Sequence, residues 1–391
     1  MPFTGKTSYA GGTDLPEIVE DVSDVVGIVT PFETPLLDHL GDPKRSAMST
    51  VHEWIEDTLI PNWDIVNQSS FTPNAQDATS ITVTSAARFQ VGDLVRPGNS
   101  AEVMQVTAIA GSVLTVVRRY GSTPASTLSN SLRLTILGNA GLEGADAATA
   151  RYTTRLRRQN YTQIFSATVG VSGTLQAVRA HGVSDELDFQ KQERLRELLR
   201  DLENCVINGT APASSPQGSA TVRRSMNGLT KQIATNAFAP GVNGFPQGGG
   251  TGNNELTEPL LNYAMRQVWD QSAGRIDTIV VGGAQKRRIN DFIGANVREF
   301  PASETRFKSM VSLYESDFGV CRVVLSRWVP ADTLLLLDSS RVQVMPLQGR
   351  SFQYRALGST GDSISGQVVG EYTLEFRNEN AHGLIRSLST T

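Results

Sequence analysis

The side chains that most often carry out chemistry in proteins are sparse in this chain. The four histidines, His39, His52, His181 and His382, show no HxxxH or HxH spacing that would bring two rings to one metal ion. The two cysteines, Cys205 and Cys321, are too few and too far apart for a disulfide framework or a zinc motif, and the chain has no G-x-S-x-G elbow. We therefore predict no catalytic residue, no metal site and no cofactor. His52 and His382 are expected on ordinary strand surfaces, and both thiols are expected to be inert in apolar surroundings.

A single turn has some features of a phosphate-binding loop. The apolar stretch at residues 276–281 predicts a strand, Gly282 and Gly283 follow it, and a short helix predicted at residues 284–293 carries Lys286. The segment lacks the first glycine and the Ser or Thr of a P-loop, and it does not match G-x-G-x-x-G. We predict an ordinary strand-to-helix turn. An α/β enzyme that uses residues 276–293 stays open as an alternative function.

The composition is typical of a globular chain with many turns. Of 391 residues, 39% are hydrophobic and 19% are charged, with 35 glycines and 17 prolines. Lys and Arg number 35 against 39 Asp and Glu, so no net basic field favours nucleic-acid or anionic-membrane binding.

The length allows about two to three domains. The first residues lack the apolar core of a signal peptide, and the longest aliphatic run, residues 334–337, is too short to cross a bilayer. We expect a soluble protein.

The first half of the chain predicts an arm and a hairpin that carries an insertion. Residues 1–50 are expected to be extended, with a short helix at 15–26. Residues 51–60 and 151–167 alternate in polarity as two strands of a hairpin. Short strands are predicted between them, separated by glycine and proline turns, as in a small β barrel or sandwich; they lie at residues 80–84, 93–96, 102–108, 113–118 and 132–136.

The second half mixes helices and strands. The strongest helix signal is at residues 185–207, where Leu195, Leu199, Leu202 and Val206 form an apolar stripe and Asn208-Gly209 ends the helix. Gly-rich loops are expected at 210–255, a helix at 256–271, and then the turn discussed above. The remaining predicted strands lie at residues 320–326, 333–338, 342–345 and 353–355, followed by a long strand and a closing strand in the tail from residue 366 to 389.

Four side chains on the hairpin are candidates for contacts with another copy of the chain. An arm and a hairpin cannot bury their apolar residues within one chain, so they need a partner surface. Arginines on projecting strands can pair with carboxylates of a neighbour. The candidates are Trp54, Arg155, Arg157 and Arg158, and the alternative for each is an ordinary solvent-exposed strand position.

The order of elements resembles the major capsid proteins of tailed bacteriophages, which have the Hong Kong 97-type fold. The segments EDVSDVVGIVTPFETPLLDHLG (residues 20–41) and VHEWIEDTL (51–59) resemble the signature of the SU-ten-type major capsid proteins. RFQVGDLVRP, AEVMQVTAI and LTVVRRYG, within residues 88–121, are similar to that family's β insertion, and YTLEFRNENAHGLIRS is similar to its final strands. The resemblance covers nearly the whole chain.

The resemblance implies an α+β capsid fold with five parts. These are an N-terminal arm at 1–50; an extended loop at 51–170 with an inserted β-domain at about 79–137; a peripheral domain at 171–250 with the spine helix 185–207; an axial domain at 251–344; and a return to the peripheral sheet at 345–391. Relatives that crosslink covalently use a Lys, an Asn and a nearby Glu, but no such triple is identified here. The signature begins near Met1, so no large fused scaffold is expected.

The implied function is structural rather than enzymatic. The chain would assemble in the host cytoplasm as hexamers and pentamers of an icosahedral head that encloses double-stranded DNA through non-specific contacts. Portal, scaffolding and decoration proteins are further partners that the resemblance allows, and no membrane is involved. A cellular encapsulin-type shell with the same fold is the main alternative. Another virion part, such as a tail or decoration protein, and the enzyme named above are the others.

Overall fold

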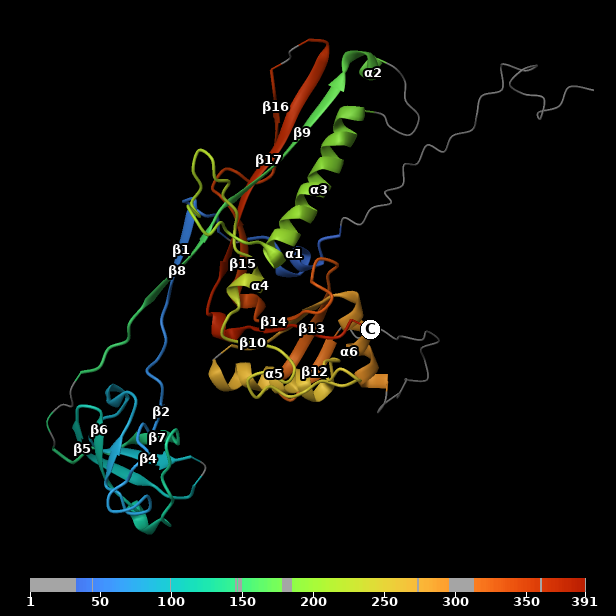
Figure 1. The fold of residues 1–391 in the computed structure, drawn as a ribbon. Helices are drawn as coiled ribbons and strands as arrows, with labels where there is room; N and C mark the ends of the chain where they lie inside the picture. The colour runs from blue at the N-terminus through green and yellow to red at the C-terminus, as the bar shows by residue number, and fades with distance from the viewer. Residues whose placement is uncertain are drawn as a thin grey trace, which may run out of the picture. The chain divides into compact units, whose positions relative to one another are not determined.

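The computed structural model describes residues 33–43, 45–98, 100–144, 146, 150–177, 185–272, 274–294, 313–358 and 361–390 (Figure 1). The chain divides into two units. The unit we call the insert is Ile55–Leu156, and the unit we call the body combines Met1–Trp54 with Arg157–Thr391. The helix expected at residues 15–26, the first part of the 20–41 signature and His181 lie outside the described residues.

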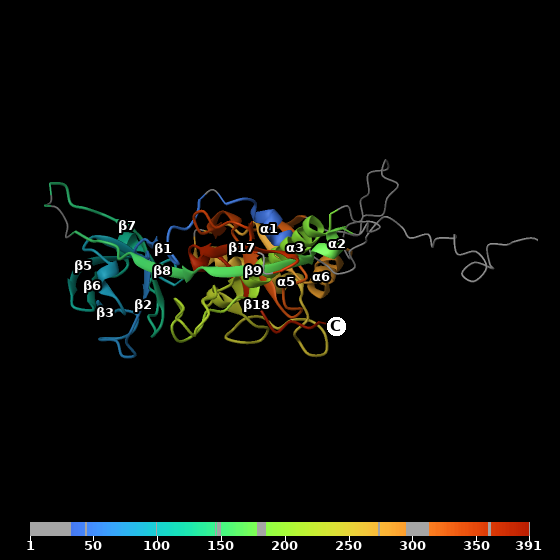
Figure 2. The same ribbon diagram turned by 90° about the horizontal axis from the view of Figure 1, so that it is seen from above.

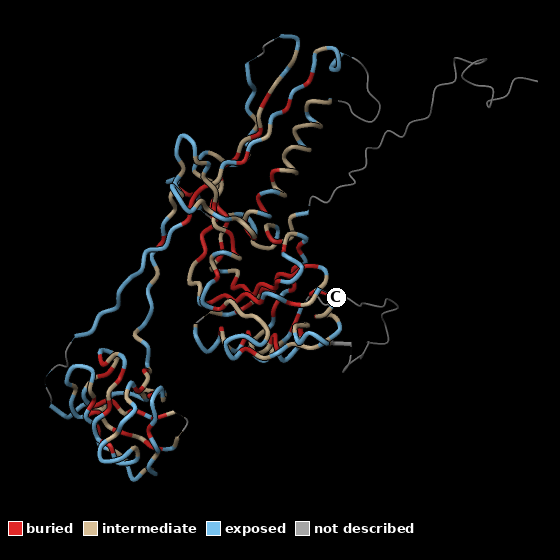
Figure 3. The backbone as a smooth tube through the Cα atoms, in the orientation of Figure 1, coloured by how far each residue is buried: buried red, intermediate tan, exposed pale blue. Residues whose placement is uncertain are grey.

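The insert is a small antiparallel barrel. Its strands are β2 (Trp63–Ile65), β3 (Ser80–Thr82), β4 (Asp93–Pro97), β5 (Met104–Ala110), β6 (Val113–Val117) and β7 (Arg133–Asn139), in the spatial order β2-β7-β4-β5-β6-β3. A bridge between Val66 and Val83 joins the two outer strands and closes the sheet. Alternate residues such as Ile81, Met104 and Leu134 point inward and are buried, as the red segments of the insert in Figure 3 show.

The long helix of the body packs against an antiparallel sheet. The sheet contains β15 (Val342–Pro346), β17 (Ser363–Phe376), β16 (Gln353–Ala356) and β9 (Gln163–Ser172), and β17 pairs with the other three strands (Figures 1 and 2). Helix α3 (Glu186–Asn208) begins at Asp185, whose carboxylate accepts from the Leu187 and Asp188 amides. Its apolar stripe differs from the expected one by one position, because Leu198 is buried while Leu199 is only half-buried.

A six-stranded mixed sheet forms the rest of the body core. Its order is β10 (Ala237–Phe238), β18 (Gly383–Ile385), β14 (Leu334–Leu337), β11 (Thr278–Val281), β13 (Gly319–Leu325) and β12 (Leu313–Ser316). Helices α5 (Glu258–Gln271) and α6 (Gly283–Gly294) share a core with one face of this sheet, through Ile279, Leu334 and Leu336. Val280, Leu335 and Leu337 face the core that contains α3. The run of four leucines is therefore a strand buried on both faces.

The closing strand corrects one prediction. Residues 345–391 were expected to return to a single sheet, but β17 and β18 belong to different sheets. Between them Asn378 takes a left-handed conformation with φ 53, and the Asn236 side chain donates to the carbonyls of Asn380 and His382. Leu384 and Ile385 are both fully buried, which requires apolar neighbours on both faces of the strand.

The remaining elements are short. Strands β1 (Val51–Glu56) and β8 (Leu156–Tyr161) pair as a two-stranded sheet where the chain leaves and re-enters the body. The short α-helices are α1 (Pro35–Leu40), α2 (Gly173–Ala177) and α4 (Leu229–Gln232), and the 3₁₀ turns are η2 (Ala86–Arg88), η3 (Tyr120–Ser122), η4 (Ser339–Arg341) and η5 (Glu379–Ala381). Among the described helices, none combines the length and apolar character that a bilayer crossing requires.

Candidate intersubunit surface

Large apolar side chains are exposed on the two stretches of chain that form the beginning and the end of the insert. Ile55 is 67% exposed, Leu59 89%, Tyr152 86% and Leu156 53%. We call these four residues the stem patch. Both stretches lie in pale blue, solvent-exposed parts of Figure 3, and the Thr153 hydroxyl donates to Asp57 Oδ2 at 3.0 Å between them. Several large apolar side chains exposed on neighbouring stretches of chain are typical of a surface that another protein covers.

The three candidate arginines of the return strand are all at the surface. Arg157 Nη1 lies 3.4 Å from Glu53 Oε2, and both side chains are exposed, so this ion pair adds little to the stability of the fold. Arg155 lines a shallow groove of about 600 Å³ together with Arg151 and Tyr152. Arg158 is also exposed. The structure thus leaves these three charges where a neighbouring chain could reach them.

Trp54, the fourth candidate, is part of the core instead. Its side chain is only 8% exposed and packs in the cluster that contains Leu36 and Phe165. The reason is the alternation of β1, which places Glu53 and Ile55 outward and Trp54 on the opposite face. The expectation that Trp54 offers a contact surface is corrected: it anchors the strand to the body.

A buried carboxylate on β17 holds the start of β1. Glu375 Oε2 lies 2.6 Å from His52 Nε2, while Glu375 Oε1 lies 3.1 Å from Arg45 Nη2 and 3.1 Å from Arg377 Nε. The hydrogen bond from His52 outweighs the burial of Glu375 and lowers the pKa of its carboxyl group. His52, expected on an ordinary strand surface, is therefore a partner of this buried acid.

A second buried carboxylate lies on the same face of β17. Glu371 accepts from Arg224 Nη2 at 2.6 Å and from the Thr162 hydroxyl at 2.6 Å, and Arg350 Nε lies 2.8 Å from its other oxygen. Between the two acids, Thr373 donates to the Tyr161 carbonyl at 3.0 Å. The alternation in EYTLEF (residues 371–376), which puts Glu371, Thr373 and Glu375 on one face, was the sequence signal for this polar face. Its arginine partners come from distant segments and had no local signal.

His382 also differs from expectation, because it is fully buried beside β18 rather than on a strand surface. Its Nδ1 accepts from the Asp338 amide at 3.2 Å, and its Nε2 lies 3.2 Å from the Arg377 carbonyl. Burial lowers the pKa of the ring to about 4. A neutral ring with two backbone partners is a structural feature rather than a general base.

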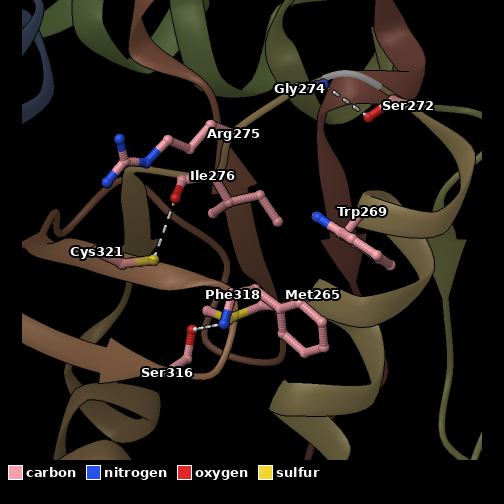
Figure 4. Close-up of a pocket in the computed structure, with 9 residues that line it drawn as sticks. All are labelled: Met265, Trp269, Ser272, Gly274, Arg275, Ile276, Ser316, Phe318 and Cys321. Carbon is pink, nitrogen blue, oxygen red and sulfur yellow. Dashed lines mark hydrogen bonds between the residues drawn. The ribbon is translucent and has the colours of Figure 1, made fainter.

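A pocket of about 300 Å³ lies beside β12 and α5 (Figure 4). Trp269 and Phe318 lie against one another in it, with ring centroids 6.0 Å apart. The Cys321 thiol donates to the Ile276 carbonyl at 3.4 Å, and burial raises its pKa to about 11. Ser316 donates to the Gly319 carbonyl, so its hydroxyl proton is used by the turn. Neither Cys321 nor Ser316 is therefore an activated nucleophile.

The strand-to-helix turn does not support the enzyme alternative either. Lys286 lies on α6 with its side chain largely buried, and that burial lowers the pKa of its amino group. A buried lysine cannot reach out to the phosphates of a nucleotide as a P-loop lysine does. Within the described part of the chain, no three His, Cys, Asp or Glu side chains are grouped so that they could hold a metal ion.

Comparison with known families decides between the alternatives. The model of the SU10 major capsid protein family matches residues 3–389. The chain belongs to this family. The predicted resemblance is thereby confirmed, and so is the prediction of a structural protein of the virion capsid rather than an enzyme.

Individual relatives are distant. A major capsid protein of Pseudomonas phage PaMx41 is 24% identical over 166 residues, a match that spans 42% of this chain and 39% of that protein. A solved structure from Mycobacterium phage Bobi is similar with a TM-score of 0.50 and 12% identity, covering 95% of this chain and 96% of the other. The capsid of a native GTA particle gives 0.53 and 9% identity over 98% and 99% of the two chains. These structures confirm the mixed α+β capsid fold over nearly the whole chain.

Proposed function

We propose that this major capsid protein assembles as hexamers and pentamers into the icosahedral head of a tailed phage, which encloses double-stranded DNA. The observation that carries the proposal is the stem patch, which the chain leaves in water. Burying a large apolar side chain contributes about 1.5–3 kcal/mol, so four of them supply roughly 6 kcal/mol or more for each copy. Association costs a similar amount in lost freedom, which favours a lattice where each copy makes several contacts.

The parts of the fold support an assignment to the five capsid regions. In this proposal residues 1–50 are the arm, and residues 51–170, including the barrel, are the extended loop that crosses onto a neighbouring copy. Helix α3 and the sheet of β9 and β17 form the peripheral domain. The six-stranded sheet with α5 and α6 forms the axial domain, and we assign β10 and β18 to it because they pair within that sheet. Portal, scaffolding and decoration proteins would join such a shell.

The experiment that tests the proposal replaces Leu59 and Tyr152 by serine in the same chain. Both side chains are exposed, so the double variant is expected to unfold at the wild-type temperature. Purified wild type is expected to form rings or shells in negative-stain electron microscopy, while the double variant stays near 42.2 kDa by light scattering. The matched control is Leu142→Ser, an exposed leucine of the insert outside the stem patch, which should assemble normally.

Charge reversal tests the arginines separately. Arg155→Glu with Arg157→Glu should weaken assembly, and raised salt should reduce the difference from wild type, because exposed charges are screened.

Assembly of the serine double variant at the wild-type protein concentration would contradict the role of the stem patch. A wild-type chain that stays monomeric with crowding agents and with other head proteins would contradict the proposed function itself.

A further inference from the structure

A basic groove lies on the outer surface of the barrel, where β4 and β7 pair side by side (Figure 1). Arg96 lies directly opposite Thr135 in this pairing. Leu134 is fully buried in the barrel, so its neighbours Arg133 and Thr135 point to the outside. The loop before β7 adds hydroxyl and amide groups. The groove measures about 580 Å³, and its polar lining is Arg96, Arg133, Thr135, Ser129, Asn130 and Ser131.

The two arginines of this groove differ from the other arginines of the barrel in their partners. Within residues 63–139, which hold the strands of the barrel, each of the other three arginines has a carboxylate within 3.1 Å; the pairs are Arg88 with Asp64, Arg118 with Glu102 and Arg119 with Asp77. Within the described residues, neither Arg96 nor Arg133 forms an ion pair. Both face solvent from one concave surface, and no acid among the described residues pairs with either of them.

The Arg133 guanidinium is held in place by an aromatic ring. It lies over the Trp63 ring, 4.5 Å from the ring centroid, and Trp63 pairs with Thr135 across the neighbouring strands. Stacking on an aromatic face fixes the plane of the guanidinium and leaves its N–H edge available to a ligand. The planar fork of an arginine matches two oxygens of a phosphate or carboxylate.

We propose that this groove binds a phosphate group. One arginine fork already matches the two oxygens of a carboxylate, whereas the tetrahedral oxygens of a phosphate take donors from several directions. Here Arg96 and Arg133 come from different strands, and the hydroxyls of Ser129 and Ser131 come from the loop. The phosphate belongs either to a nucleic-acid backbone or to a small phosphorylated molecule. The proposal does not depend on shell assembly.

The test measures binding of two probes to the full chain. Binding of a fluorescein-labelled single-stranded oligonucleotide of about ten nucleotides is measured by fluorescence anisotropy. Inorganic pyrophosphate is added as a competitor of the oligonucleotide. In a separate experiment, calorimetry measures the binding of pyrophosphate without the oligonucleotide. Arg96→Ala and Arg133→Ala are each expected to weaken binding about tenfold or more, because each removes a charged hydrogen-bond donor. Arg133→Lys should lose most of the same affinity, since lysine keeps the charge but lacks the fork.

Arg119→Ala is the matched control, because it removes the same charge from the barrel outside the groove and should change binding by less than about twofold. All variants are exposed substitutions and should keep the wild-type melting temperature. Binding of both probes through Arg96 and Arg133 assigns the site to nucleic acid, and binding of pyrophosphate alone assigns it to a small phosphorylated molecule. Wild-type affinity of Arg96→Ala and Arg133→Ala for both probes, or no binding by wild type, overturns the proposal. Neither result bears on the shells seen by electron microscopy.

Discussion

The buried ion pair of the barrel gives the sharpest test of how the insert is stabilised. Glu102 has no exposed surface, and its two oxygens accept from Arg118 Nε and Nη2, each at 2.8 Å. The Ser126 amide and hydroxyl donate to the same carboxylate at 2.8 and 2.7 Å. These bonds tie the loop after β6 to the start of β5. Glu102→Gln would leave the Arg118 guanidinium buried without a counter-charge.

The size of the effect follows from the acidity of Glu102. Burial alone raises the pKa of the carboxyl group, but the hydrogen bonds from Arg118 and Ser126 outweigh it and lower the pKa from 4.5 to about 2. At about 1.4 kcal/mol for each pH unit, the charged form contributes roughly 3 kcal/mol to folding at pH 7. Because the folded pKa is the lower one, this contribution exists above pH 4.5 and is lost as the pH falls through 2. At pH 3 about 1.4 kcal/mol of it remains.

Hydrogen exchange read by mass spectrometry on peptides from residues 80–137 measures the local free energy of unfolding in the full chain. Glu102→Gln should lower this free energy by roughly 3 kcal/mol at pH 7 and by about half of that at pH 3. Glu143→Gln, an exposed glutamate of the insert, is the control and should change it by less than about 0.5 kcal/mol. Equal protection in Glu102→Gln and wild type at pH 7, or a difference that does not shrink at pH 3, would refute the reasoning.

Three further predictions concern the body. Burial lowers the pKa of His382 to about 4, so the unfolded chain takes up the proton at a higher pH than the folded chain does. The free energy of unfolding of the body should therefore fall by about 2.5 kcal/mol between pH 8 and pH 4.5. In urea unfolding, this decrease should be smaller by the same amount for His382→Gln. Burial raises the pKa of Glu203, so its negative charge destabilises the fold as the pH rises. Glu203→Gln should therefore melt at a higher temperature than wild type at pH 8, and the difference should shrink as the pH falls. Equal melting temperatures at pH 8 would contradict this. Trp54→Ala should lower the free energy of unfolding, measured with denaturant, by about 3–5 kcal/mol, whereas Arg157→Ala should lower it by less than about 0.5 kcal/mol. A larger effect of Arg157→Ala would contradict the burial of Trp54.

The features that were predictable from the sequence are those that depend on neighbours along the chain. The helix expected at residues 185–207 is α3 at Glu186–Asn208, because its apolar period and its Asp185 cap are local signals. The strands of the barrel were found within a few residues, since Val and Thr alternation and glycine turns mark them. Strand β2, three residues long, was missed.

Features that depend on distant partners were not predictable. Trp54 and Glu53 are adjacent in one strand, and only the packing of the body decides which of them is buried. His382 follows a turn whose direction depends on Asn236, and the segment then joins a different sheet from β17. The groove on the barrel was missed for the same reason: Arg96 and Arg133 are far apart in the sequence and meet only through the β4–β7 pairing.

The polar face of β17 shows what the fold requires where the hairpin meets the body. Replacing a buried ion pair by apolar residues often leaves stability unchanged, so the two acids are not explained by stability alone. A shift of β17 by one residue would turn Leu374 and Phe376 toward the arginines and Glu375 toward the apolar core around α3. Such a state leaves a charge buried without a partner, which costs several kcal/mol. Glu371 and Glu375 therefore fix a single register of β17, and with it the point at which β1 leaves the body.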